Sequence, residues 1–558
     1  MTTTGADTGS PRRLRRPPAG TSGREGSAPR LENPLRWSRW LVLPFGLAYL
    51  ILMAHQLGSA ITSTNLDADA ASGPVIGELF GAAPAHANVV LGEFGWYATL
   101  LFDLATKWLP DHRQVWEGAP YAMALAGAGL AASSVWQVAG RWAATVTAVV
   151  LVCASPATVH LLLSTTQHAP AWFCLALLGA FLVLLERRAT ALRWPVLAAL
   201  VLLVGTIVGV NAGSDALVTV AAVAPFALAL VVAAVLAPRG ESRRALWTGI
   251  ATLITVGVAW ATTAITMSAL SVTPEPGLHT TKIAIGAKTA TNLKLLVKSV
   301  AVLGNGDFFG RSLSAGSALE LVCAALSLAA VVLLPWLGWR ALRTRRSDAL
   351  TAFYVFWSSS AILLALAFLF SAAPVDIGAD RYVVGLLYAA AAVVPAAVAG
   401  NVRAETAVVV ATCVLAFGAI VSLADGATSS GRPIHPPPLT ARDAQRIARV
   451  AARHHLSVGY AGYWEAAPVT WSTAFRVHVY PVSVCNQGAN LCRFDLHFIS
   501  SWYEPRAHTG SFLLIDDQTS QSVTRPTPDL GHPVAVYRVG KFSLYAYGYD
   551  IAAKMKIT

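Results

Sequence analysis

Charged residues are scarce in this chain. Asp, Glu, Lys and Arg make up 13% of its 558 residues, whereas an average soluble protein carries about 25%. The mean hydropathy is +0.55, and 55% of the residues are hydrophobic. The charge deficit is concentrated in residues 40–424, where long runs of Ala, Val and Leu alternate with short polar links. This pattern excludes a soluble globular enzyme and a disordered chain, and it predicts an integral membrane protein.

Motifs of nucleotide-dependent and hydrolytic enzymes are also missing. The sequence has no Walker A loop, no G-x-G-x-x-G after a strand, no H-E-x-x-H and no G-x-S-x-G. The links that we place inside the cell are too short to hold a soluble nucleotide-sugar domain. A sugar donor would therefore have to arrive on a lipid.

Eleven apolar runs are long enough to cross the membrane, since about 20 residues span the hydrocarbon core. The runs are 40–60, 118–139, 142–163, 170–186, 194–211, 215–237, 246–269, 317–339, 350–371, 382–400 and 406–424. Ionisable residues are nearly absent from them. Proton- or sodium-coupled carriers normally bury carboxylates or His near the midplane, so the composition favours an enzyme over a pump.

Basic residues cluster between the apolar runs. Clusters occur in the N-terminal tail and near Arg141, Arg187, Arg239, Arg343 and Arg403. A cytoplasmic N-terminus places all of them inside, as the positive-inside rule requires. We therefore expect a multi-pass plasma-membrane protein with an extracytoplasmic C-terminus. Nucleic-acid binding is not expected, because no basic groove or stacking module appears.

This topology divides the chain into three parts. They are a disordered basic cytoplasmic tail (1–36), a transmembrane domain (37–424) with outer loops 61–117 and 270–316, and an extracytoplasmic domain (425–558). Residues 89–110 of the first loop predict one or two helices in the membrane interface, with Trp and Tyr at headgroup depth. The third part has a helical stretch over 441–455 and then short alternating runs, which predict a small α/β domain.

The six cysteines fit this division. Four lie within apolar runs, where a lone cysteine is usually a small hydrophobe; Cys485 and Cys492 form the only pair in the C-terminal part. In an oxidising compartment we expect these two to form a disulfide. The alternative is a metal half-site, but no second ligand pair has zinc spacing.

Polar residues gather at the outer ends of the runs. The clearest group is Asn-Leu-Asp-Ala-Asp at 65–69, directly after the first run. Asp67 and Asp69 could bind a divalent cation, or one could act as general base while the other orients it. The alternative is a solvated loop in which Asp is a turn former.

The order of these features resembles the GT-C glycosyltransferases, and among them the protein mannosyltransferase and aminoarabinose transferase-like enzymes. The features are a cytoplasmic N-terminus, a first span, and an acidic outer loop with interfacial helices. Three further segments look similar: the small-residue hairpin at 202–230, Asp380-Arg381-Tyr382 before a late span, and GYAGYWEAAPVTW at 459–471. The resemblance covers about residues 37–475. It implies a polytopic α-helical fold and a polyprenyl-phosphate-linked sugar as donor.

The resemblance also implies roles for the site residues. The family places a catalytic Asp early in the first outer loop, which corresponds to Asp67 or Asp69; we expect Asp67 as base and Asp69 as its helper. This chain has Asp-Ala-Asp where many members carry adjacent acids. The leaving phosphate is an anion that needs cations, and Arg381 could clamp it bidentately.

The sequence offers further candidate residues for binding the donor and the acceptor. Lys282, Lys288 and Arg311 of the second outer loop could help to hold the donor phosphate; the alternative is contact with anionic lipid headgroups. His168, Tyr382 and Trp464 could contact the substrate, although His168 could equally be a structural hydrogen-bonding group and the aromatic residues could form a domain core. Asp215 is expected to cap the following helix.

The sequence thus predicts a GT-C-like enzyme that moves a sugar from polyprenyl phosphate to a cell-envelope glycan, lipid or protein on the outer face. A divalent cation at Asp67 and Asp69 is the one cofactor to consider. The alternatives are a lipid or glycan transporter and a non-catalytic envelope-assembly protein. The catalytic interpretation requires the acidic pair and Arg381 to share one cavity, because clamp and base must reach one sugar.

Overall fold

The computed structural model describes most of the chain. The described residues are 40–64, 68–80, 83–84, 87–91, 101–102, 105–106, 108–109, 112–163, 168–236, 243–274, 283–309, 312, 314–344, 348–424, 439–507, 509–518 and 523–556. The N-terminal tail and the linker before the C-terminal domain lie outside them.

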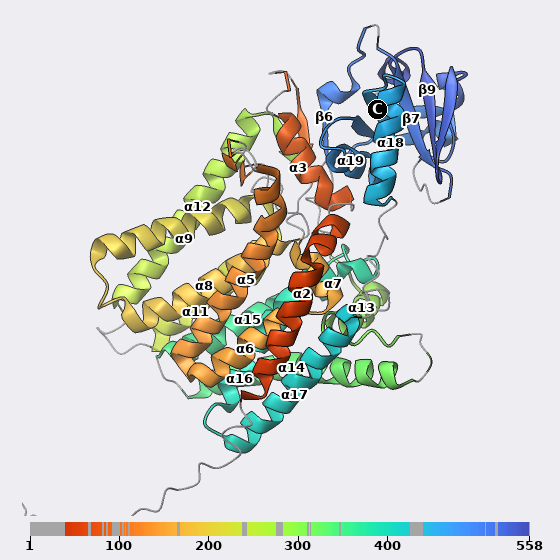
Figure 1. The fold of residues 1–558 in the computed structure, drawn as a ribbon. Coiled ribbons are helices and arrows are strands. Elements are labelled where there is room, and N and C mark those ends of the chain that lie inside the picture. The colour runs from red at the N-terminus through yellow and green to blue at the C-terminus, as the bar shows by residue number, and fades with distance from the viewer. Residues whose placement is uncertain are drawn as a thin grey trace, which may run out of the picture.

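A helical bundle forms the larger part of the molecule (Figure 1). Its elements are α2 (Val42–Thr64), α5 (His112–Ala139), α6 (Arg141–Val152), α7 (Pro156–Leu163), α8 (Ala169–Arg188), α9 (Trp194–Ser214), α10 (Ala216–Val218), the π-helix η2 (Thr219–Val223), α11 (Ala224–Leu236), α12 (Arg243–Ala269), α13 (Ala287–Leu303), α14 (Ala315–Arg343), α15 (Ala349–Phe370), α16 (Val384–Val398) and α17 (Val402–Ala424). Among the described residues, eight helices are long and apolar enough to cross a membrane, and the bent pair α6–α7 makes a ninth. Two shorter apolar stretches, Val42–Gly58 of α2 and Val384–Val398 of α16, lie where the sequence predicts two further spans.

The run 142–163 is the exception to straight spans. The structure breaks it into α6 and α7, which meet at an angle of 84°. Pro156 begins α7, and proline favours a break at this point because it has no N–H to donate to the preceding turn and its ring clashes with that turn. Ser155 stabilises the new start, since its hydroxyl accepts a hydrogen bond of 3.1 Å from the backbone N–H of Thr158.

Small residues allow close helix packing inside the bundle. At Gly209 of α9 a Cβ atom would lie 2.5 Å from the carbonyl oxygen of Val256 in α12, so only glycine fits there. At Gly179 of α8 a Cβ atom would meet the rings of Phe356 and Trp357 in α15. Such contacts are typical of helices that associate in a membrane.

Arg and Trp side chains mark one end of the bundle. Four pairs place a guanidinium over an indole ring: Arg141–Trp136, Arg244–Trp194, Arg340–Trp336 and Arg343–Trp339. They occupy the last turns of α5 and α14 and the starts of α6, α9 and α12. Successive crossings put these ends on the side where α2 begins, opposite the C-terminal domain. Trp and Arg are typical of a membrane–water boundary.

The C-terminal domain contains a six-stranded sheet. The elements of the domain are α18 (Ala441–Arg453), β3 (Val458–Ala461), α19 (Tyr463–Ser472), β4 (His478–Cys485), η4 (Asn486–Gly488), β5 (Asn490–Arg493), β6 (Phe498–Ile499), η5 (Ser500–Tyr503), β7 (Ser511–Asp516), η6 (Pro528–Leu530), β8 (Ala535–Val539), β9 (Phe542–Tyr547) and η7 (Ile551–Lys554). The strand order in the six-stranded sheet is β5-β4-β3-β7-β9-β8. Strands β4, β3 and β7 are parallel, so β3, α19 and β4 form a βαβ unit. A disulfide joins Cys485 to Cys492 across the β4–β5 hairpin.

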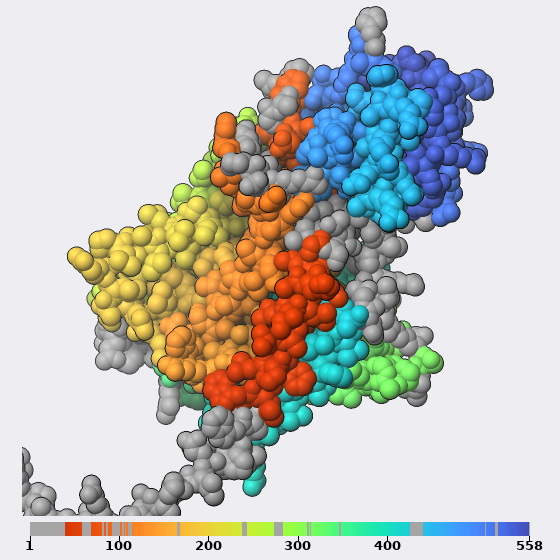
Figure 2. Space-filling model, viewed as in Figure 1, coloured from red at the N-terminus to blue at the C-terminus, as the bar shows by residue number. Residues whose placement is uncertain are grey.

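A second, small sheet joins this domain to both outer loops. It consists of β1 (Val89–Leu91) between β2 (Val272–Pro274) and β6. The stretch 89–110 therefore begins as a strand and not as the interfacial helix that the sequence predicts, because Val-Val-Leu finds partners on two sides. The helix α3 (Ala68–Phe80) of the first loop packs against α19. Figure 2 shows the C-terminal domain seated on this loop.

Candidate functional site

Asp69 lies in the first turn of α3, where three distant segments meet. Its Oδ1 accepts a hydrogen bond of 2.6 Å from the hydroxyl of Tyr463 in α19. Its Oδ2 lies 3.7 Å from Nη1 of Arg381, which belongs to the link between α15 and α16. Both charged side chains are about one quarter exposed, at 25% for Arg381 and 26% for Asp69. The pair therefore sits at an opening between the bundle and the C-terminal domain.

Arg381 is held by the short helix η3 (Ile377–Tyr382). Asp376 caps this helix by accepting a hydrogen bond of 2.9 Å from the N–H of Gly378. Arg381 donates to the hydroxyl of Tyr382 over 3.4 Å, and its guanidinium lies 5.3 Å from the centre of that ring. The neighbouring Asp380 is buried. Burial raises the pKa of Asp380 to about 7, and the nearby Arg381 opposes this shift.

His168 also contacts the ring of Tyr382. It precedes α8 in a left-handed conformation with φ of 66°, and its ring centre lies 5.1 Å from that of Tyr382. Its Nδ1 is 2.7 Å from Oδ2 of Asp215, and both residues are buried. Asp215 also caps α10, as the sequence predicts, by accepting from the N–H of Leu217. Its pairing with His168 was not predicted, because no spacing rule connects residues so far apart.

Aromatic rings surround Tyr463. Phe494 stacks on it with ring centres 4.8 Å apart, Trp464 meets it edge-on at 5.3 Å, and His497 lies at 5.8 Å. Burial lowers the pKa of His497 to about 4, although the charge of Asp69 opposes the shift. His497 is therefore neutral at physiological pH. Sequence reasoning missed Phe494 and His497, because both fall in a run that alternation assigns to a strand.

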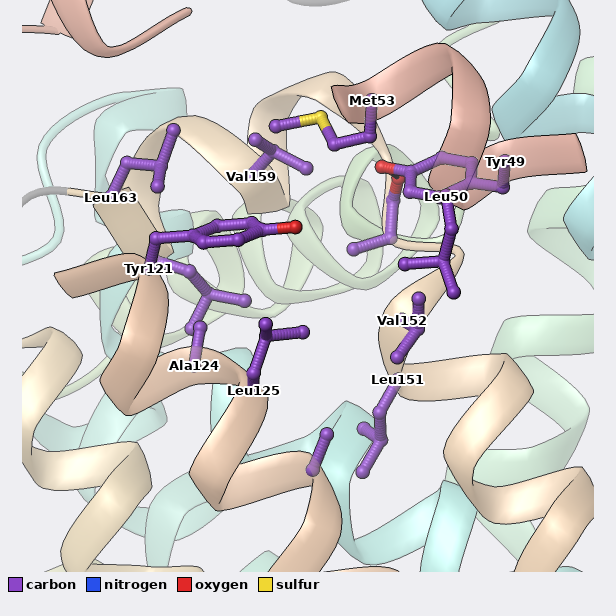
Figure 3. Close-up of a pocket in the computed structure, with 13 residues that line it drawn as sticks. Tyr49, Leu50, Met53, Tyr121, Ala124, Leu125, Leu151, Val152, Val159 and Leu163 are labelled. Carbon is purple, nitrogen blue, oxygen red and sulfur yellow. Dashed lines mark hydrogen bonds between the residues drawn. The ribbon is translucent and has the colours of Figure 1, made fainter. Parts of the chain in front are cut away.

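Two apolar pockets flank the break between α6 and α7. The first lies between α2, α5 and the break, and its empty space is about 460 Å³ with its open mouth included. Figure 3 shows the hydroxyl of Tyr121 pointing into it. Leu50 and Leu125 at its edge are 39% and 41% exposed, so the pocket opens on the outer surface of the bundle.

The second pocket lies at the start of α16, directly after η3. Its wall includes Asn305, Ser327, Leu387 and Tyr388. It shares Leu151, Ala154 and Leu162 with the first pocket, so the residues around the α6–α7 break separate the two. The carbonyl oxygen of the Asn305 side chain is buried and has no hydrogen-bond partner among the described residues. The lining also includes Val384, the first residue of α16, which follows Tyr382 by two positions.

The structure brings together five of the predicted site residues. They are Asp69, His168, Arg381, Tyr382 and Trp464. Lys288 on α13 instead donates a hydrogen bond to the carbonyl oxygen of Pro374, just before η3. Asp67, Lys282 and Arg311 lie outside the described residues.

Metal binding has no visible support in the part of the chain that the structure describes. No three His, Cys, Asp or Glu side chains of that part lie close enough to hold an ion together. The divalent cation at Asp67 and Asp69 stays a prediction.

The fold can be compared with known proteins. No protein-family model matches this chain, and no curated protein matches its sequence. The crystal structure of ArnT from Cupriavidus metallidurans bound to undecaprenyl phosphate superposes with a TM-score of 0.53 at 14% identity, over 89% of this chain and 97% of ArnT. The apo form gives 0.52 at 14%, over 91% and 98%. The chain therefore shares the fold of ArnT, and it has the polytopic α-helical architecture with a small C-terminal domain that the sequence predicts.

Proposed function

We propose that this protein is a membrane glycosyltransferase that moves a sugar from a polyprenyl-phosphate carrier to a cell-envelope acceptor at the outer face. The observation that carries the proposal is the contact of Asp69 with Arg381 and Tyr463. It places an acid, a cation and an aromatic group at one membrane boundary. The shared fold with ArnT, which binds undecaprenyl phosphate in its crystal structure, supports the same reaction class.

The donor phosphate binds at Arg381 in this proposal. A planar guanidinium can hold two phosphate oxygens at once. The sugar–phosphate bond breaks through an oxocarbenium-like transition state, as in glycoside hydrolysis, and polyprenyl phosphate leaves as an anion. Because this leaving group is already charged, it needs a cation and not a general acid. Lys282, Lys288 and Arg311 remain candidate second cations.

The acceptor hydroxyl needs a base. As the bond from its oxygen to the sugar carbon forms, its proton passes to a carboxylate. We assign this role to Asp67. Asp69 is instead the organising carboxylate, because Tyr463 and Arg381 already occupy its two oxygens.

The prenyl chain of the donor occupies the second pocket. This pocket begins at α16, directly after Arg381 and Tyr382, and apolar side chains line most of it. In this proposal the prenyl chain runs from the phosphate at Arg381 into this pocket. The four Arg–Trp pairs support the orientation of this proposal, because clustered arginines are typical of cytoplasmic loops. The N-terminus is then inside and the C-terminal domain outside.

The test is sugar transfer in proteoliposomes. A panel of radiolabelled polyprenyl-phosphate sugars is supplied with envelope extract, and wild type is compared with Asp67→Asn, Asp69→Asn and Arg381→Ala. We expect Asp67→Asn to lose turnover and keep donor binding, and Arg381→Ala to lose donor binding.

Arg244→Ala provides a matched control. Arg244 bonds the carbonyl oxygens of Thr190 and Leu192 at the opposite end of the bundle, so its loss removes an arginine without touching the site. Equal donor turnover in all variants would show that the assigned site is wrong. Donor that fails to bind wild type at all would favour the transporter or the non-catalytic assembly protein.

A further inference from the structure

Asp215 is a buried carboxylate that serves two partners. Its Oδ1 caps α10 by accepting from the N–H of Leu217 at 2.9 Å. Its Oδ2 meets Nδ1 of His168 at 2.7 Å. The two residues have 3% and 4% exposed side chains. A helix cap needs only one oxygen, so the second contact is a separate feature of this chain.

The partner of Asp215 has a defined tautomer. A carboxylate can only accept hydrogen bonds, so the proton of the imidazole must be on Nδ1. With its proton directed at Asp215, the His168 ring cannot turn over without losing this charge-assisted hydrogen bond. Asp215 therefore fixes which face of the imidazole meets Tyr382.

A series of contacts continues from His168 to the acidic loop. The ring of Tyr382 contacts both His168, with ring centres 5.1 Å apart, and the guanidinium of Arg381, at 5.3 Å. Arg381 also bonds the Tyr382 hydroxyl and then pairs with Asp69. An arginine side chain loses rotamer entropy when it is held in one orientation. A fixed ring beside it reduces the orientations it can adopt before substrate arrives.

We propose that Asp215 is a positioning residue for the donor phosphate. Through His168 and Tyr382 it holds the Arg381 guanidinium in the direction in which it meets the phosphate. Asp215 touches neither substrate nor reacting atoms, and the inference rests on the proposed role of Arg381. The junction of α9 and α10, where Asp215 lies, then contributes to donor affinity in addition to capping a helix.

The test is the affinity of the purified full-length protein for undecaprenyl phosphate in nanodiscs, followed by donor KM and kcat. Asp215→Asn keeps the size and the helix-capping ability of the side chain and removes its charge. We expect the dissociation constant and the donor KM to rise about tenfold, and kcat to change by less than threefold.

Asp348→Asn is the matched control. Asp348 also caps a helix, accepting from the N–H of Thr351 at 2.8 Å, but at the start of α15 and therefore at the far end of the bundle. Its variant should bind as wild type does. If it weakens binding as much as Asp215→Asn, the effect is one of helix capping, and the proposal fails.

A second variant tests the route. His168→Phe keeps a ring against Tyr382 and removes the bond to Asp215. If Asp215 acts through His168, the double variant Asp215→Asn/His168→Phe binds no more weakly than His168→Phe alone. Additive losses, or wild-type affinity in Asp215→Asn, would overturn the proposal. Wild-type protein that does not bind undecaprenyl phosphate would instead refute the proposed function itself.

Discussion

Replacing Tyr463 with Phe removes one hydroxyl from the contact between the C-terminal domain and the first outer loop. The ring can stay in place, because Phe494 stacks on it at 4.8 Å and Trp464 meets its edge. What disappears is the 2.6 Å hydrogen bond to Oδ1 of Asp69. Asp69 then keeps its contact with Arg381, at the longer distance of 3.7 Å.

The size of the effect follows from that one bond. Hydrogen bonds to charged groups contribute about 1.5–3 kcal/mol. Asp69 is 26% exposed, and water at the site replaces part of the lost interaction, so the low end of the range applies. About 1.4 kcal/mol corresponds to a tenfold change in rate. We therefore expect kcat/KM for sugar transfer to fall about tenfold, with thermal stability nearly unchanged.

Tyr503→Phe supplies the comparison. Tyr503 lies in the same domain, and its hydroxyl donates to the carbonyl oxygen of Pro481 at 2.6 Å. Losing this buried neutral bond should cost about 1–2 kcal/mol of stability and leave transfer unchanged. Both variants are measured in the proteoliposome assay and by thermal unfolding. Wild-type kcat/KM in Tyr463→Phe, or equal losses of activity in both variants, would refute the reasoning.

Three further predictions concern other parts of the chain. Leu415→Trp fills the second pocket and should raise KM for long-chain donors but not for a short-chain analogue. The control Leu366→Trp, at a position 44% exposed on the bundle surface, should change neither KM. Equal KM values for both chain lengths in Leu415→Trp would contradict the pocket assignment. Burial raises the pKa of Glu465 to about 7, with Asp516 reinforcing the shift. Between about pH 4.5 and 7 the folded domain therefore keeps a proton on Glu465 that the unfolded chain has already released. Wild type should lose stability from pH 5 to pH 8, and Glu465→Gln should lose less. Equal pH slopes of the melting temperature in the two proteins would contradict this. The double variant Cys485→Ser/Cys492→Ser opens a short loop and should lower the unfolding free energy by about 2–3 kcal/mol, whereas an unchanged denaturation midpoint would show that the disulfide constrains nothing.

Hydropathy located the membrane helices well, because each crossing needs a long apolar run whatever its neighbours are. It could not locate the bend at Ser155 and Pro156, since the run continues through it without a polar interruption. In the C-terminal domain, alternation found β4, β7, β8 and β9. The helix α19 was missed because its ten residues include Pro468 and two Trp, which do not show a helical period.

The site was less accessible from sequence. Tyr463 and Asp69 are 394 positions apart, and only a resemblance to a known architecture suggested that their segments would meet. We expected Arg381 and Tyr382 to bind substrate, but the spacing of these residues in the sequence did not show that Tyr382 would contact both His168 and Arg381. Contacts between distant segments depend on how the helices pack, and that information is spread over the whole chain.

The small sheet of β1, β2 and β6 has a consequence for biosynthesis. Its central strand is made early, but the N–H of Ser500, next to β6, bonds the carbonyl oxygen of Asn88 across 412 positions. A ribosome must therefore finish almost the entire polypeptide before this sheet can close. Until then the partners of β1 are incomplete. The contact of Tyr463 with Asp69 also waits for the C-terminal domain, because the two residues are 394 positions apart. A chain that terminates before this domain would hold the membrane helices without the junction.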